Sequence, residues 1–163
     1  MTARPNALPW LLLSAFVIAI DQFTKWLALA KLGSVGSIAV IPGILNWTLA
    51  FNPGAAFSFL ADQDGWQRWL FAALALGVSA ILIVWLARTP RYDWKDAAPL
   101  ALIIGGALGN LIDRLRLGHV VDFIHIHWQG AWHYPAFNIA DSSIFVGAVM
   151  LIAFGLFRRT PAK

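Results

Sequence analysis

Residues 105–141 read GGALGNLIDRLRLGHVVDFIHIHWQGAWHYPAFNIAD and join two apolar segments of the chain. The stretch opens as a glycine-rich apolar helix and runs through polar and aromatic residues to the next apolar run. Asp122 lies in VVDFI, and Asp141 ends FNIAD just before the apolar residues 144–157. A carboxylate is costly in apolar surroundings, so each aspartate needs a reason to be there. Two that converge are typical of a pair that shares one proton and activates water.

The spacing between the two aspartates excludes a single helical face. We expect Asp122 at the exit of the third apolar helix or on a following strand, and Asp141 at the start of the fourth helix. A helix N-terminus favours the anion of an acid placed there. The valine, phenylalanine and isoleucine neighbours of Asp122 favour its protonated form. A helix-capping role alone explains Asp141 but leaves Asp122 unexplained.

The composition is that of a membrane protein. The chain has 163 residues, of which 60% are hydrophobic and 12% are charged, and its mean hydropathy is +0.69. Soluble domains carry about 25% charged residues. The sequence contains no cysteine, which excludes disulfides and thiolate metal sites. We expect a single integral-membrane domain over residues 1–163.

Four apolar segments reach the roughly 17–25 residues that span a bilayer. They are residues 9–29, 66–87, 97–115 and 141–157. A cleavable signal peptide is the alternative for the first, with Arg4 before the apolar residues and a small-residue site at 28–30. Asp21 and Lys25 lie within the region before that site and argue against cleavage. The sequence predicts a membrane α-helical fold with four transmembrane helices.

The basic residues predict the orientation. They gather where apolar segments end, so the net charge of +4 indicates a membrane topology signal rather than a nucleic-acid-binding patch. Those assigned to one side are Arg4, Arg88, Arg91, Lys95, Arg158, Arg159 and Lys163. Those assigned to the other side are Lys25, Lys31, Arg68, Arg114 and Arg116. Because basic residues in short loops stay in the cytoplasm, we expect both termini inside and the connections 32–65 and 116–140 outside.

The sequences of the two outer connections predict structure beyond that of simple linkers. Residues 37–59 are rich in β-branched and aromatic residues and contain Pro-Gly and Asn-Pro-Gly turns. This pattern predicts a small extracytoplasmic β-sheet or hairpin on the membrane. In the second connection Trp128, Trp132 and Tyr134 favour the headgroup zone. A turn alone explains Asn52 of the Asn-Pro-Gly motif.

Helix 1 carries Asp21 and Lys25 at i and i+4 with the acid first, the favoured order for an ion pair. This pair either ends the span or supports a site. On the third helix, Gly105 and Gly109 form a GxxxG motif that allows another helix to approach closely.

Polar residues follow one turn later, at Asn110, Asp113 and Arg114. Asp113 and Arg116 can pair at the helix end, but polar residues within a membrane mark functional sites by default. We favour a functional role for this cluster.

Four histidines lie in the second outer connection, at positions 119, 125, 127 and 133. His125 and His127 share one face of a strand. With Asp122 nearby they form an alternative metal site. No HExxH motif accompanies them, and a pair of aspartates needs no metal, so we predict neither a metal nor another cofactor.

Five blocks of the sequence resemble the lipoprotein signal peptidases, or signal peptidase II. They are DQFTK (21–25), NPGAAF (52–57), GGALGNLIDRL (105–115), VVDFI (120–124) and PAFNIADS (135–142). Each block alone is a weak signal, but five in order over essentially the whole chain are specific, and no motif position departs from the family pattern. The resemblance implies an inner-membrane aspartyl protease with four helices. It implies removal of the signal peptide of a prolipoprotein, by a cut before a cysteine that carries diacylglycerol.

The resemblance also implies site residues and partners. Asp122 and Asp141 become the catalytic pair, and Asn52 becomes more than a turn residue. Family positions that support the site or bind substrate are Asp21, Lys25, Asn52, Gly106, Asn110, Arg114, Asn138 and Ala140. The expected partners are lipidated prolipoproteins and membrane lipid, with no nucleic acid and with the chain as a monomer. The expected location is the bacterial inner membrane, with the site facing the periplasm.

Two other classes of function compete with this one. A proton- or ion-coupled transporter also places aspartate and arginine within the membrane. Four spans without a broken inverted repeat argue against it. A structural or assembly protein explains the GxxxG motif but not two acids in apolar settings.

Overall fold

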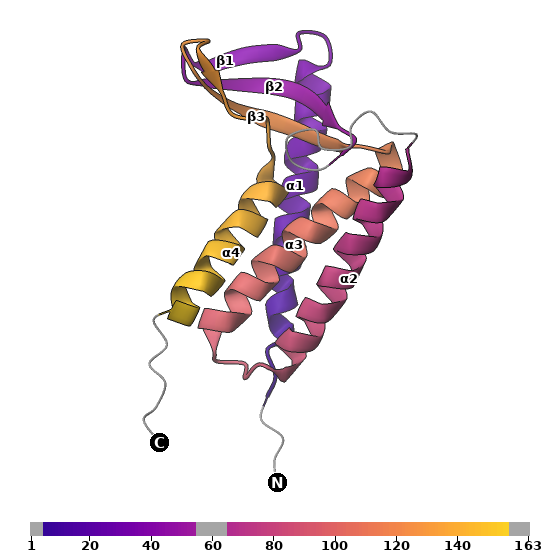
Figure 1. Ribbon diagram of the computed structural model, residues 1–163, viewed down its shortest axis with the longest axis vertical. Helices are drawn as coiled ribbons and strands as arrows, with labels where there is room; N and C mark the ends of the chain where they lie inside the picture. The colour runs from indigo at the N-terminus through magenta and orange to yellow at the C-terminus, as the bar shows by residue number, and fades with distance from the viewer. Residues whose placement is uncertain (1–4, 55–64, 157–163) are drawn as a thin grey trace.

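The computed structural model describes residues 5–54 and 65–156, which form four long helices and a four-stranded sheet (Figure 1). The helices are α1 (Leu11–Leu32), α2 (Trp66–Arg88), α3 (Trp94–Leu117) and α4 (Ile139–Leu156), and the 3-10 turn η1 (Leu8–Trp10) leads into α1. The strands are β1 (Ser37–Ile41), β2 (Leu45–Asn52), β3 (Val120–Trp128) and β4 (Trp132–His133).

The described helices include four that are long and apolar enough to cross a bilayer: Leu8–Leu32, Trp66–Arg88, Trp94–Leu117 and Ile139–Leu156. The predicted membrane α-helical fold with a small β element is therefore confirmed. The predicted starts of the last two helices were wrong by a few residues. Helix α3 begins at Trp94 because its charged first turn precedes the apolar part, and α4 begins at Ile139 because Asn138 caps it.

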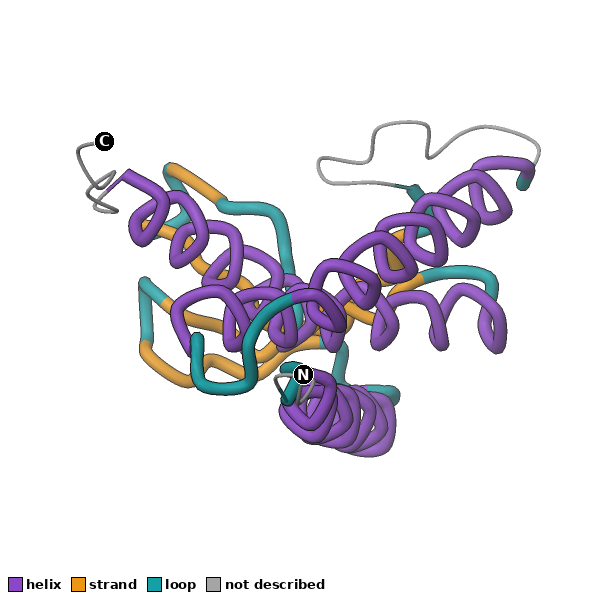
Figure 2. The backbone as a smooth tube through the Cα atoms, turned by 90° about the horizontal axis from the view of Figure 1, so that it is seen from below, coloured by secondary structure: helices purple, strands orange, loops and turns teal. Residues whose placement is uncertain are grey.

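Helix α3 packs against each of the other three helices and lies among them in both views (Figures 1 and 2). A Cβ atom added to Gly105 would lie 2.8 Å from Cβ of Val17 and 2.9 Å from the carbonyl oxygen of Ser14, both on α1. A Cβ atom on Gly109 would lie 2.8 Å from Oδ2 of Asp21. The close approach predicted from GxxxG is confirmed, and α1 is the partner helix.

Glycines also bring α4 close to α3. A Cβ atom on Gly106 would overlap the carbonyl oxygen of Ala140, and one on Gly147 would lie 2.8 Å from the carbonyl oxygen of Pro99. Any larger residue at Gly106 therefore pushes the first turn of α4 away from α3.

The sheet has the order β1-β2-β3-β4 and is antiparallel throughout. It joins the two outer connections, since β1 and β2 come from the first and β3 and β4 from the second. The hairpin predicted within 37–59 is confirmed for its described part, while residues 55–59 lie outside the described residues. Pairing of β2 with β3 places Ala50 opposite Asp122 and Asn52 opposite Val120.

The sheet and the start of α4 lie at one end of the helices, and the connection between α2 and α3 lies at the other (Figure 1). That connection pairs with the segment before α1, because the N–H of Ala7 donates to the carbonyl of Thr89 and the N–H of Arg91 donates to that of Pro5. The basic residues Arg88, Arg91 and Lys95 therefore lie far from the sheet.

Candidate active site

Reciprocal hydrogen bonds between Asn138 and Asp141 hold the start of α4. The N–H of Asp141 donates to Oδ1 of Asn138 at 2.9 Å, and the N–H of Asn138 donates to Oδ2 of Asp141 at 3.3 Å. This arrangement is a capping box, which satisfies donors that a helix start leaves free. It places the Asp141 carboxylate in the first helical turn, where the helix dipole stabilises negative charge.

Asp122 lies on β3 and is only 2% exposed. Its Oδ1 accepts a hydrogen bond from Nδ2 of Asn138 at 2.7 Å, and its Oδ2 accepts one from Nδ2 of Asn52 at 3.3 Å. Burial, and then the negative charge of Asp141, raise the pKa of Asp122 to about 7, although both amide donors oppose the rise. The direction agrees with the expectation from its apolar neighbours. Both protonation states of Asp122 are therefore populated near neutral pH.

Asn138 links the two aspartates directly, and Asn110 adds a second link. Nδ2 of Asn138 also lies 3.2 Å from Oδ1 of Asn110, whose Nδ2 donates to Oδ1 of Asp141 at 2.7 Å. The strand after α3 and the start of α4 are thus the elements that bring Asp122 and Asp141 to one place, as expected from their spacing.

A buried ion cluster lies beside this pair. Nζ of Lys25 is 2.8 Å from Oδ2 of Asp21 and 2.9 Å from Oδ2 of Asp113. It also donates to Oδ1 of Asn110 at 2.8 Å. The three charged side chains are at most 3% exposed, so each depends on its partners for compensation of its charge. Asp113 therefore pairs with Lys25, and the alternative helix-end pair with Arg116 was wrong.

The two carboxylates of the cluster also hold the backbone just before each aspartate of the pair. Oδ1 of Asp21 accepts the N–H of Ala140 at 2.9 Å, and Oδ2 of Asp113 accepts the N–H of Val121 at 3.1 Å. Ala140 and Val121 directly precede the two aspartates in the sequence. One cluster on α1 and α3 therefore fixes both backbone positions relative to each other.

Asn52 and Arg114 complete the surroundings of the pair. Oδ1 of Asn52 accepts the N–H of Gly54 at 3.1 Å, and its side-chain amide donates to Asp122, so the residue both forms the turn and contacts the pair. The guanidinium of Arg114 donates to the carbonyl of Gly54 at 3.2 Å and interacts electrostatically with both aspartates of the pair. Arg114 thus brings a positive charge to the edge of the site.

Comparison with known proteins identifies the family. Residues 13–157 match the family described as Signal peptidase (SPase) II. The chain belongs to this family. The resemblance drawn from the five sequence blocks is confirmed, and the chain is a peptidase by family.

Relatives cover nearly the whole chain. The lipoprotein signal peptidase of Pseudomonas aeruginosa (strain UCBPP-PA14) is 58% identical over 155 residues, which are 95% of this chain and 91% of that protein. The lipoprotein signal peptidase of Pseudomonas fluorescens (strain Pf0-1) is 59% identical over 148 residues, 91% of this chain and 87% of that protein. A solved structure described as "Bacterial membrane enzyme structure by the in meso method at 2.3 A resolution" matches with a TM-score of 0.80 and 31% identity, covering 100% of this chain and 99% of that chain.

Two residues at this site go beyond the candidate set: Asp113, which the sequence placed only in the polar cluster of α3, and Gln22, which it did not single out. Its position one helical turn after Asn110 indicated Asp113 in the sequence, but its contact with the backbone of Val121 could not be predicted from the sequence. Nε2 of Gln22 donates to Oδ1 of Asp113 at 2.8 Å and to the carbonyl of Gly109 at 3.2 Å. The sequence feature that could have indicated Gln22 is its polar amide side chain inside an apolar helix.

The histidines lie apart from the pair. The rings of His125, His127 and His133 stack with centroids 5.2–5.7 Å apart. Side chains alternate along a strand, so Asp122 lies on the opposite face of β3 from His125 and His127. Within residues 5–54 and 65–156, no group of three residues with metal-binding side chains is placed to hold a metal ion. The alternative metal set of Asp122, His125 and His127 is therefore not brought together.

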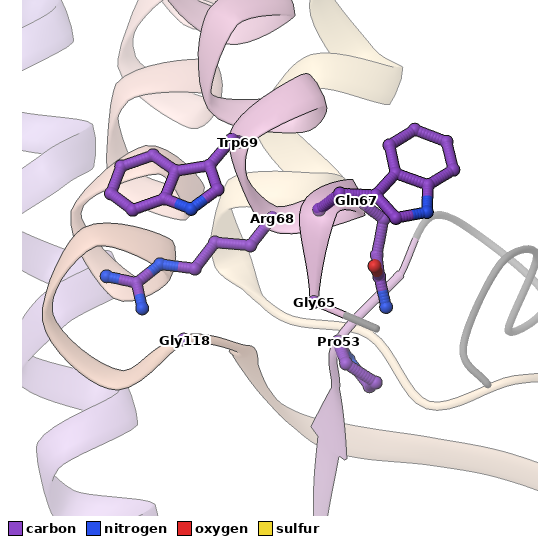
Figure 3. Close-up of a pocket in the computed structure, with 7 residues that line it drawn as sticks. Pro53, Gly65, Gln67, Arg68, Trp69 and Gly118 are labelled. Atoms are coloured by element: carbon purple, nitrogen blue, oxygen red, sulfur yellow. The ribbon is translucent and has the colours of Figure 1, made fainter. Parts of the chain in front are cut away.

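A cavity of about 420 Å³ lies at the start of α2 (Figure 3). Arg68 lies along it, donates to the carbonyl of Leu115 at 2.8 Å and holds its guanidinium 4.8 Å from the ring centroid of Trp69. Neither Asp122 nor Asp141 lines this cavity, so it is separate from the pair.

Proposed function

We propose that this signal peptidase II family member is an aspartyl endopeptidase with Asp122 and Asp141 as its catalytic residues. Its substrates are prolipoproteins, cut before a cysteine that carries diacylglycerol. The observation that supports this most strongly is the pair itself, in which Asn138 contacts both carboxylates and burial raises the pKa of Asp122 to about 7. The names of the relatives, lipoprotein signal peptidases, support the substrate class.

The mechanism begins with ionised Asp141 and protonated Asp122. Asp141 accepts a proton from water while the water oxygen attacks the carbonyl carbon before the cysteine. Asp122 donates a hydrogen bond to the carbonyl oxygen as negative charge develops on it. Asp141 then returns the proton to the amide nitrogen, the C–N bond breaks, and the new carboxyl and amino ends separate. The two roles can be exchanged, because a coupled pair titrates as a unit.

The surrounding residues position the pair in this scheme. Asn52 and Asn138 orient Asp122, and Asn110 orients Asp141, each through the amide contacts already given. Asp21 and Lys25 hold Ala140 through the buried cluster.

Gly106 contributes through its lack of a side chain, and Arg114 contributes through its positive charge. Gly106 has no side chain, which lets the first turn of α4 reach α3. Arg114 places positive charge near both carboxylates and stabilises the form of the pair that carries one negative charge.

The proposed location is the bacterial inner membrane, with the sheet on the periplasmic side. The connection between α2 and α3 carries Arg88, Arg91 and Lys95, and such basic connections stay in the cytoplasm. A signal helix enters the membrane with its basic end inside, so its cleavage site arrives at the outer leaflet. A pair of aspartates at the sheet end meets it there.

The experiment that tests the function is cleavage of a lipidated precursor by the purified protein in detergent. We expect a shorter product whose new N-terminus is the lipidated cysteine, identified by mass spectrometry. The same precursor without its diacylglyceryl group should remain uncut. Absence of any product from a folded preparation would contradict the peptidase assignment and favour the transporter or assembly interpretations.

A further inference from the structure

Two apolar cavities lie next to each other against α4. One has a volume of about 470 Å³ and the other about 370 Å³. Tyr134, Phe137, Asp141 and Phe145 line both of them. Both volumes fall within the roughly 300–1,000 Å³ of ligand-binding cavities.

The walls of both cavities are mainly aliphatic and aromatic. Trp132 and Val146 line only the larger cavity, and Ile144 and Ala148 line only the smaller one. Among the described residues that line the two cavities, Asp141 is the one with a carboxylate. Such walls offer few partners for the polar backbone of a peptide, whose donors and acceptors are costly to bury unpaired, and they suit hydrocarbon.

The cavities open on the face of α4 that meets lipid. Phe145 is 70% exposed and Val146 is 47% exposed, whereas Val149 and Ile152, further along α4, are exposed but line neither cavity. Trp132 lies on β4 at the sheet end of this face, and its indole favours the boundary between headgroups and hydrocarbon. An occupant of the cavities therefore lies beside the first turns of α4, at the level of the outer leaflet.

We infer that the two cavities hold the two acyl chains of the diacylglyceryl group on the substrate cysteine. This rests on the proposed function, since Asp141 is taken as one of the catalytic residues. Membrane phospholipids have similar chains, but Asp141 lies in both linings and ties the occupant to the reacting bond. The diacylglyceryl group is attached to the residue just after the scissile carbonyl, so its chains enter beside Asp141. Two cavities match two chains.

The inference predicts a specific kinetic effect. The acyl chains take no part in bond breaking, so their contacts contribute equally to the bound substrate and to the transition state. Loss of such contacts raises KM and leaves kcat unchanged. The effect should also grow with the length of the chains, because burial of each methylene adds to affinity.

The main test compares Val146→Phe with Val149→Phe. Both valines lie on α4 and are 47% exposed, but only Val146 lines a cavity. The substrates are two synthetic precursors that differ only in carrying palmitoyl or hexanoyl chains. We expect Val146→Phe to raise KM for the palmitoyl precursor about tenfold, since the added ring displaces a chain worth several methylenes of burial. Its KM for the hexanoyl precursor should change about twofold, and Val149→Phe should leave both values as in the wild type.

A second comparison keeps the inference testable if Val146→Phe misfolds. Phe145→Ala removes a wall shared by both cavities, and Ile152→Ala removes a similarly exposed side chain from the same helix outside them. Only Phe145→Ala should weaken the preference for palmitoyl over hexanoyl chains, with unchanged kcat.

The outcomes separate the two proposals. If the wild type cuts both precursors but the cavity variants match their controls, the acyl-chain assignment is wrong and the peptidase function stands. The same conclusion follows if Val146→Phe affects both precursors equally, because a peptide or a bulk phospholipid would then fill the cavity. If the folded wild type cuts neither precursor, the proposed function and this inference fail together.

Discussion

Two pairs of carboxylates lie near the sheet end of the helices, and the group between their members differs. The ammonium of Lys25 lies between Asp21 and Asp113, at 2.8 and 2.9 Å. Between Asp122 and Asp141 lies Asn138, whose side-chain amide donates to Asp122 and whose backbone N–H donates to Asp141. An ammonium carries a full positive charge, whereas an amide donates hydrogen bonds without adding charge.

Because of this difference in charge, we assign a supporting role to the first pair and a reactive role to the second. The cluster around Lys25 has its own counter-ion and holds the backbone at Ala140 and Val121. The pair held by Asn138 has a neutral bridge, so burial and mutual repulsion raise the pKa of Asp122 to about 7. Proton transfer near neutral pH requires a group of that kind.

The largest expected effect comes from removing either carboxylate of the reactive pair. Asp122→Asn and Asp141→Asn should each lower kcat/KM by about 10⁴-fold or more, because each loses a proton acceptor or donor of the reaction. The double variant should be hardly slower than either single one, since the two act as a unit. Precursor cleavage in detergent measures this, with Asp96→Asn at the far end of α3 as the control. Near-normal turnover by either single variant would falsify the assignment.

Removal of the counter-ion from the supporting cluster should lower the stability of the fold. Lys25→Met leaves two buried carboxylates without their counter-ion, which should cost about 3–5 kcal/mol in the free energy of unfolding. Lys31→Met changes an exposed lysine on the same helix and should stay within about 0.5 kcal/mol. Unfolding in mixed detergent measures both variants. Equal stability of the two would show that the cluster around Lys25 contributes nothing to support.

A residue that positions the pair should change kcat without changing KM. Asp113→Ala removes the acceptor for the N–H of Val121 and should lower kcat about 10–100-fold through misplacement of Asp122. Asp113→Asn keeps an oxygen acceptor and should recover part of the loss. If the two variants are equally slow, the negative charge of Asp113 is what matters, not its hold on the strand.

The sequence predicts most of the fold, because the decisive signals are local. The length of an apolar run and the spacing of turn residues are enough for the helices and for the β1–β2 hairpin. The pairing of β2 with β3 and the contact from Asp113 to Val121 join distant segments, and no local pattern encodes them. Gly106 and Asn138 entered the site only through resemblance to a family, since a glycine and an asparagine near a helix start have many ordinary roles.

The pH dependence of cleavage tests the raised pKa of Asp122. Because the pKa of Asp122 is raised to about 7, its proton is lost as pH rises through that value, and kcat/KM should fall about tenfold per pH unit above it. Asn52 stabilises the anion of Asp122 through its amide, so Asn52→Ala should move this fall to higher pH. By linkage, Asp122 contributes stability that is fully present below its ordinary pKa and is lost as pH rises through about 7. A pH profile of Asn52→Ala that moves to lower pH would contradict the role of that hydrogen bond.

The smallest effect is expected where neither pair of carboxylates is touched. His125 and His127 lie on the face of β3 opposite Asp122, so a hydrolysis carried by the aspartates does not depend on them. Replacing both histidines with glutamine should change kcat/KM by about twofold or less, the scale of an ordinary surface change. Excess chelator should likewise leave the rate of precursor cleavage unchanged. If chelator abolishes cleavage and zinc restores it, a metal takes part, and the amide-bridged pair cannot activate water by itself.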